Sequence, residues 1–288
     1  MVIGGHQVLN GTHLSIPPTI EFDCSHTNES TANEASIKLY NMSAETQRKL
    51  FVEGKRVEVE AGYWPQDGQR DTGIIFKGVI RKVSTVTENN VDVVSTLTFG
   101  DGDDAVNVRR HKKKYPKGTK HATVVAGIAE DFKKDGITLG KIDIPDFQEP
   151  RPLTVERPAW RVLEDICHQH DRIWSVQDGV LNVYPADKPL VDKGIVLEPS
   201  TGLIGPPEFT DDGIEIKTLM VHYLRPGHTF ILKSGSGSSR ATEKYRIEEV
   251  SFAGSNVGGD FGATIKAKVM TGAGKVKRSR DRKKGRRP

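Results

Sequence analysis

The stretch IRKVS, residues 80–84, returns as IEEVS at residues 247–251, and this pair is the first indication of the fold. Each copy is followed twelve or thirteen residues later by another strand-like stretch, TLTF in the first case and TIKAKV in the second. Each is also preceded by an alternating segment, RVEVEAG or HTFILKSG. The shared order of strand, loop, strand, turn and strand predicts two related β-domains in one chain.

Apolar and polar residues alternate through most of the first hundred positions, a period of two that is typical of half-buried strands. The residues expected on the buried faces are Ala35, Ile37, Leu39, Val57, Val59, Ala61, Val91, Val93, Leu97 and Phe99. A short helix capped by Ser43 interrupts these strands and stops before Gly54. The turn DGDDA, residues 101–105, ends the segment.

The middle of the chain has a different pattern. The stretch HATVVAGIAEDFKK spaces its apolar residues as a helix does, and a second helix is expected after Pro158. Asp178-Gly179 lies between two apolar-rich runs and predicts a β-hairpin, because glycine tolerates the positive φ of a type I′ turn. Alternation then resumes in GIEIKTLMVHY, YRIEEVSF and TIKAKV.

These patterns predict a mainly β fold with an α/β insert. We expect the first β-domain at residues 1–104, a smaller α/β domain at 105–195 and the second β-domain at 196–272. A basic, flexible tail is expected at 273–288, since like charges repel and few apolar residues are present there.

Composition narrows the class of protein. The chain has 288 residues, two cysteines and no apolar run long enough to span a membrane, and its start lacks the pattern of a signal peptide. Two cysteines exclude a disulfide framework, so we expect assembly in a reducing compartment. The tail has nine basic residues and one Asp within a chain of net charge +4, which leaves a mildly acidic body.

The stretch CHQHD, residues 167–171, raises the question of a metal or catalytic site. Cys167 and His170 are three residues apart on the predicted helix and share a face, so both could contact one ion. A structural zinc site needs four ligands, however, and Cys167 also continues the apolar face of Trp160 and Leu163. We therefore favour a helix terminus that leads into the hairpin.

Other catalytic motifs are incomplete. GAGKVKRS lacks the first glycine and the Ser or Thr of a phosphate-binding loop, and an EF-hand starting at Asp101 would place Lys112 where Glu is needed. A pair of glycosidase carboxylates from distant positions stays open, although nothing favours it. The sequence predicts no cofactor and no enzymatic activity.

Two basic clusters are candidates for contact with a partner or with DNA. Each cluster could instead be a solvated segment. Only Tyr115 is present for stacking on bases, so sequence-specific reading of nucleic acid is not expected. The candidates are Arg109, Arg110, Lys112, Lys113, Lys114 and Lys117 in the first cluster, and Lys275, Lys277, Arg278, Arg280, Arg282, Lys283, Lys284, Arg286 and Arg287 in the tail.

The order of motifs over residues 15 to 270 resembles the central baseplate hub of contractile-tailed bacteriophages. The motifs that carry the resemblance are RVEVEAGY, IIFKGVI, TLTFGDGDDAV, KYPKGTKHATVVAGIAEDF, PAWRVLEDICHQHDRIWSVQDGVLNVYP, LEPSTGLIGPPEFTDDGIEIKTLM, RPG and YRIEEVSFAGSN. No single motif is diagnostic, but the ordered set is fairly specific. The first dozen residues and the basic tail lie outside the resemblance.

The resemblance implies a non-enzymatic virion protein whose two β-domains are tube-like β-barrels. It implies a homotrimer that places six barrels in a ring, joins the sixfold tail tube to the threefold central spike and encloses the ejection channel. The implied partners are the spike, the tube or tube-initiator proteins, the tape measure protein and DNA passing without sequence specificity. The implied location is the tail baseplate, after assembly in the host cytoplasm. The alternatives are a tail-tip hub of a non-contractile long tail, a nucleic-acid-binding protein and a cell-wall hydrolase.

Overall fold

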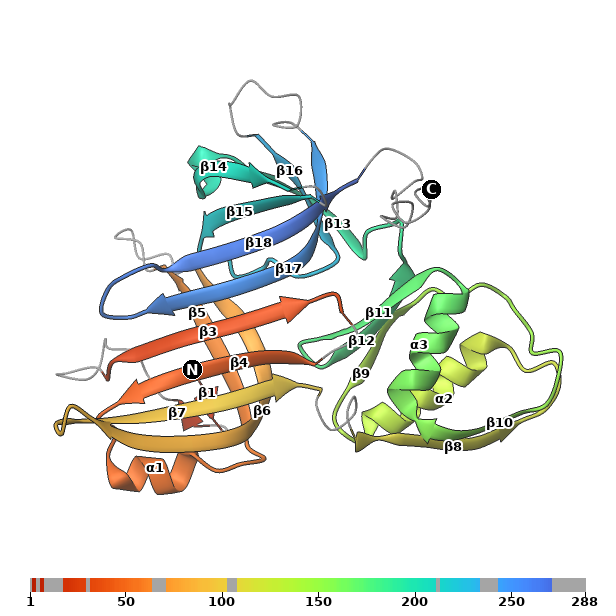
Figure 1. Ribbon diagram of the computed structural model, residues 1–288, viewed down its shortest axis with the longest axis horizontal. Coiled ribbons are helices and arrows are strands. Elements are labelled where there is room, and N and C mark those ends of the chain that lie inside the picture. Colours follow the sequence, from red (N-terminus) through yellow and green to blue (C-terminus); the bar gives the residue numbers. More distant parts are fainter. Residues whose placement is uncertain are drawn as a thin grey trace, which may run out of the picture.

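The protein is mainly β, with an α/β insert attached to one side of a large sheet (Figure 1). The computed structural model describes residues 2–3, 6–7, 18–29, 32–63, 71–102, 108–210, 213–233 and 243–270. The basic tail from Lys275 to Arg287 lies outside these residues. Within them, the chain forms a first β-unit, the insert and a second β-unit, in that order.

The first β-unit is an antiparallel sheet with the strand order β3-β4-β7-β6-β5. Its elements are β3 (Ile20–Thr27), β4 (Asn33–Tyr40), α1 (Ala44–Leu50), β5 (Arg56–Tyr63), β6 (Asp71–Glu88) and β7 (Asp92–Asp101). The short strands β1 (Val2–Ile3) and β2 (His6–Gln7) extend the sheet beyond β5. Ser43 caps α1 as predicted, since its side chain accepts a hydrogen bond from the Thr46 amide at 3.2 Å.

The insert is a separate α/β layer structure. It comprises β8 (Arg110–Tyr115), α2 (His121–Lys133), β9 (Thr138–Ile142), β10 (Leu153–Pro158), α3 (Ala159–Gln169), β11 (Arg172–Gln177) and β12 (Val180–Pro185). The two helices pack between the two-stranded sheet β10-β8 and the three-stranded sheet β11-β12-β9 (Figure 1). Asp178 and Gly179 have φ values of 52° and 77°, as the predicted type I′ turn requires.

The second β-unit repeats the sheet of the first with the order β14-β15-β18-β17-β16. Its elements are β13 (Val191–Leu197), η2 (Pro199–Thr201), β14 (Leu203–Phe209), β15 (Ile214–Leu219), β16 (His228–Leu232), β17 (Lys244–Ser255) and β18 (Gly262–Val269). Strand β13 adds to β16 in parallel, a pairing without a counterpart among the described strands of the first β-unit.

Two hydrophobic cores stabilise the molecule. One is continuous across both β-units and includes Ile37, Phe99, Ile216 and Phe252. The other belongs to the insert, where the predicted apolar face of α2 and the residues Leu163 and Cys167 of α3 are buried. The predicted domain boundaries separate these cores approximately, and they stay predictions.

The alternation in the sequence predicts the buried faces of β4 and β5 correctly and, in β7, the burial of Leu97 and Phe99, but it is wrong for Val91. Val91 is 78% exposed in the turn before β7, whereas Val94 is buried. Because Val93 and Val94 are adjacent, the alternation does not show where the strand begins. Val91 lies before the first residue of β7 and is therefore outside the sheet. The strand order is also open at β14 and β2 among the described residues, so closure of each unit into a barrel stays a prediction.

Candidate assembly interface

The two β-units share one hydrogen-bond register. Across four strands of the first unit, Ile80, Phe99, Ala35 and Cys24 lie opposite one another and form one row, or rung. The corresponding rung of the second unit contains Ile247, Ala267, Ile214 and Phe209. The repeat of IRKVS and IEEVS therefore extends beyond the sequence match to the neighbouring strands.

A β-bulge occupies the same place in both units. The register of β6 and β7 shifts between Ile80 and Lys82, and that of β17 and β18 shifts between Ile247 and Glu249. The next rung contains Lys82, Thr98, Ser36 and Asp23 in the first unit. Its counterpart contains Glu249, Lys266, Glu215 and Glu208. Because bulges fix register and twist, two matching bulges indicate a duplicated unit.

The two units are joined edge to edge. The second half of β17 pairs antiparallel with β3, from Glu249 opposite Thr27 to Ser255 opposite Glu21. Phe252 and Cys24 face each other in this internal junction, and both are fully buried. Burial there raises the pKa of the Cys24 thiol above its ordinary value, so this cysteine is a packing residue.

The hairpin β11–β12 attaches the insert to the first β-unit through buried polar contacts, the insert junction. The Gln177 side chain donates to the Thr27 carbonyl at 2.8 Å and lies 3.2 Å from the His26 ring. Asn33 donates to the Val176 carbonyl at 2.9 Å, and the Gly179 amide donates to Asp101 at 2.9 Å. Asp101 thus ends β7 as a buried anchor for the hairpin, a role that the predicted turn did not indicate.

Arg225 ties the hairpin to both β-units. Its guanidinium donates to Asp178 at 2.7 Å and to the Ile74 carbonyl at 2.8 Å. Burial, with the nearby Arg225, lowers the pKa of His26 to about 4, and burial next to the Asp178 carboxylate raises that of Asp101 to about 7. Buried groups of this kind hold a fixed arrangement, because each loses a partner if the parts separate.

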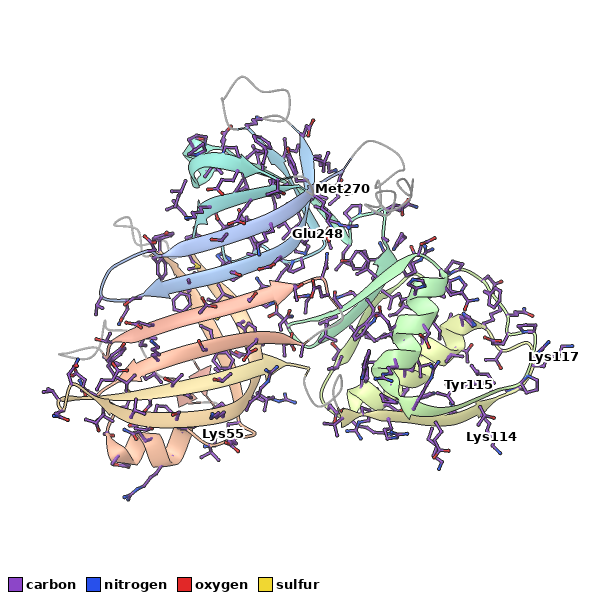
Figure 2. The ribbon with its side chains drawn as sticks, in the orientation of Figure 1. Lys55, Lys114, Tyr115, Lys117, Glu248 and Met270 are labelled. Atoms are coloured by element: carbon purple, nitrogen blue, oxygen red, sulfur yellow. The ribbon has the colours of Figure 1, made fainter. Side chains whose placement is uncertain are left out.

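The first basic cluster lies on and next to β8 of the insert and is partly paired. Arg109 forms an ion pair with Asp135, and Lys112 forms one with Glu156 at 2.7 Å. Arg110 donates to the Glu156 carbonyl at 3.2 Å. The remaining members are exposed on or just after β8, where Lys113 lies 5.5 Å from the centre of the Tyr115 ring and Lys114 and Lys117 point outward (Figure 2).

Cys167 and His170 have different surroundings. Cys167 is buried in the core of the insert, where burial raises its pKa to about 12. His170 caps the end of α3, and its ring lies 2.8 Å from that of His121, which in turn contacts Glu149. Burial and the neighbouring His121 lower the pKa of His170. The stretch CHQHD is a helix terminus before a hairpin, the interpretation that the sequence favoured.

Sequence reasoning selected charged clusters, but it did not identify which strands form the open edges or which buried polar residues form the insert junction. Buried Gln, Asn and His side chains form no periodic pattern, so only the structure reveals their partners. The repeat of IRKVS and IEEVS indicates which strands are equivalent, but it identifies the open edges only when the register of the strands is known. Among the described residues, no helix combines the length and apolar character that a membrane crossing needs.

Residues 13–267 match a protein family described as Baseplate hub gp41. No curated protein sequence is similar enough to match the chain. Solved structures of low sequence identity share its fold. The E. coli c3393 protein, a type VI secretion component described as similar to the T4 phage tail proteins gp27 and gp5, has 11% identity and a TM-score of 0.62 over 91% of this chain and 76% of its own.

Two tail proteins have the same fold. A 43 kDa tail protein of prophage MuSo2 from Shewanella oneidensis is 10% identical, with a TM-score of 0.59 over 87% of this chain and 97% of its own. A tail protein from Neisseria meningitidis MC58 is also 10% identical, with a TM-score of 0.61 over 86% of this chain and 91% of its own.

Proposed function

This chain belongs to the Baseplate hub gp41 family of structural phage tail proteins, and from that premise we propose that three copies form a ring that joins a sixfold tail tube to a threefold central spike. The observation that carries the proposal is the duplication. Each chain has two β-units of the same strand order, register and bulge position. Three chains therefore present six similar units, a number that matches a sixfold tube while the assembly itself stays threefold.

The neighbours of this ring follow from its two ends. The face with six similar β-units contacts the tube or tube-initiator proteins, and the opposite face contacts the spike. The channel passes the tape measure protein and then DNA, without sequence specificity. The location is the tail baseplate of the virion, after assembly in the host cytoplasm. A rigid support suits this role better than catalysis, and we propose no enzymatic activity.

The basic clusters have separate roles in the proposal. Arg109 and Lys112 are paired with Asp135 and Glu156, whereas Lys113, Lys114 and Lys117 are exposed, so the insert cluster keeps a candidate role as a contact for a partner or DNA. The tail keeps its candidate role as a contact for DNA, the tape measure protein or an acidic baseplate surface. Deleting residues 275–288 tests this role: we expect impaired assembly or ejection in phage production, and unchanged infectivity would reject it.

The mass of the assembly tests the central proposal. Native mass spectrometry of the purified chain, alone and with the spike and tube proteins of its phage, is expected to give three copies per complex. Electron microscopy of the virion is expected to place the density at the tail tip, with sixfold features toward the tube. A chain that stays monomeric in every mixture contradicts the proposal.

A further inference from the structure

We propose that neighbouring chains pair the outer edge of β6 with the outer edge of β14, in the register that β17 and β3 use inside one chain. The inference rests on the proposed ring and names the contact that would hold it together. Its basis is that β6 and β17 are equivalent strands, and so are β14 and β3, as the matching rungs show.

Both edges are open in the described part of the chain. Strand β5 pairs with β6 only from Asp71 to Val79, so residues 82–88 of β6 have β7 on one side and no strand on the other. Strand β14 pairs with β15 alone. In the internal junction, the equivalent edges of β17 and β3 are joined. An open strand edge is a template for another strand, and the duplication defines which one fits.

The register follows by counting along the strands from the shared rungs. Phe252 of the internal junction corresponds to Thr85, and its partner Cys24 corresponds to Phe209. The pair Ala253 and Asp23 corresponds to Val86 and Glu208. We therefore place Thr85 of one chain opposite Phe209 of the next, and Val86 opposite Glu208.

The exposed residues on these edges agree with a covered surface. Phe252 and Cys24 are fully buried in the internal junction, whereas Thr85 is exposed and Phe209 is 39% exposed. The sizes also compensate, because a large residue faces a small one in both pairs. The pair Ala253 and Asp23 stays exposed in the internal junction, and its counterparts Val86 and Glu208 are exposed as well. Exposed apolar residues along an open strand edge are typical of a surface that another chain covers.

Charge and shape limit the pairing to this register. Lys82 lies at one end of the β6 edge, and β14 has Glu208, with Asp211 and Asp212 next in the sequence after Thr210. Pro206 and Pro207 lie in the register shift of β14 between Ile204 and Glu208, and proline has no amide to donate. Pairing is therefore expected near Glu208 and Phe209 rather than along the whole strand.

The proposed ring repeats one geometric relation between neighbouring β-units. The internal junction relates the second β-unit to the first within a chain, and the proposed junction relates the first unit to the second unit of the next chain. Both steps use equivalent strands, so the ring alternates three internal and three intermolecular junctions. Such a head-to-tail contact uses two different surfaces of each chain and closes only if the rotation fits.

Cysteine cross-linking tests the register. In a variant with Val86→Cys and Glu208→Cys, the two thiols of neighbouring chains lie directly opposite, within the distance that a disulfide spans. Mild oxidation of the full chain is expected to give a ladder of covalent dimers and trimers that ends at three on a denaturing gel. The native Cys24 and Cys167 are both buried and free, so they do not compete.

Three controls fix the geometry. Asp23→Cys with Ala253→Cys is expected to cross-link within one chain, because these residues face each other in the internal junction. Val86→Cys with Glu215→Cys moves one thiol a strand further, about 10 Å from its partner, and is expected to give no product. Each single-cysteine variant is expected to stay monomeric on the denaturing gel.

The outcomes separate the inference from the proposed function. A trimer in native mass spectrometry that gives no cross-link with Val86→Cys and Glu208→Cys overturns the strand pairing and leaves the trimer standing. Dimers from Val86→Cys alone would mean that two β6 edges pair, which also overturns it. A ladder that continues beyond three overturns the closed ring. A chain that is monomeric in all mixtures overturns the proposed function itself.

Discussion

Buried polar residues, rather than apolar ones, determine how the insert is oriented against the first β-unit. His26, Asn33, Asp101 and Gln177 are all buried, and each contacts a group on the other side of the insert junction. An apolar contact tolerates sliding, whereas a buried hydrogen bond is lost when its partner moves. The sequence could not predict this set, because its members lie in four separate strands and share no pattern.

Asp101 is expected to make the stability of the protein depend on pH. Burial beside Asp178 raises its folded pKa to about 7, above the value in the unfolded chain. Its contribution to stability is therefore present at low pH and is lost as pH rises through 7. We expect Asp101→Asn to be stabilising relative to the native chain, and more so at pH 8 than at pH 6 by about 1 kcal/mol.

Urea unfolding of both chains at pH 6 and 8 measures this difference. Comparing the two chains at each pH cancels the opposite effect of His26 and His228, whose lowered pKa values of about 4 remove stability as pH falls below 6.5. Glu53→Gln, at an exposed carboxylate, is the control and should show no such difference. An equal effect of Asp101→Asn at both pH values would contradict the role of its titration.

Arg225 is expected to be the most sensitive charged residue. Arg225→Met would leave the partly buried Asp178 without its cation and remove donors from three carbonyls. Breaking a largely buried pair in this way is expected to cost about 3 kcal/mol of unfolding free energy. Lys112→Met breaks an exposed pair with Glu156 and should cost less than about 1 kcal/mol. Similar losses in the two variants, measured by urea unfolding, would show that Arg225 is not structural.

At the scale of elements, the local sequence pattern predicted most of the helices and strands but few of the pairings between strands. The helices α2 and α3 and the hairpin at Asp178 follow from spacing and from one turn signal, both of which are local. The pairing of β17 with β3 joins residues more than two hundred positions apart. Only the repeat of IRKVS and IEEVS carried information about it, because duplicated units repeat their strand order.

Pro206 and Pro207 are expected to restrict what the edge of β14 can bind. Neither residue has an amide to donate, so β14 offers fewer hydrogen bonds to a neighbouring strand, which protects against unselective pairing. A variant with both prolines changed to Thr is expected to form species larger than the native assembly in size-exclusion chromatography. Pro150→Thr, at an exposed loop position, is the control. If the double variant elutes as the native chain does, the prolines have no protective role.

For the whole molecule, the two cores differ in how they are joined to the rest. The β-units share one continuous apolar core and one strand pairing, so they are expected to unfold together. The insert has its own core and contacts the β-units mainly through the insert junction. The sequence predicted three domains, but the nature of these contacts could only come from the structure.

Gln177→Leu is therefore expected to uncouple the insert from the β-units. The change removes the contacts to Thr27, His26 and Asn33 and leaves buried polar groups unpaired, which costs about 1–3 kcal/mol each in general. In native-state hydrogen exchange, the slowest amides of α3 and β18 should open with the same free energy in the native chain. In the variant, α3 should open more easily than β18, because the insert can then unfold alone.

Asn182→Ala is the matched control for this experiment. Asn182 lies on the same hairpin, but its side chain accepts from the Lys141 amide and donates to the Val180 carbonyl, both within the insert. Asn182→Ala should lower the opening free energies of α3 and β18 by the same amount. The insert junction stays intact in this variant, so the insert and the β-units still unfold together. Equal opening of α3 and β18 in Gln177→Leu would mean that apolar contacts alone couple the parts.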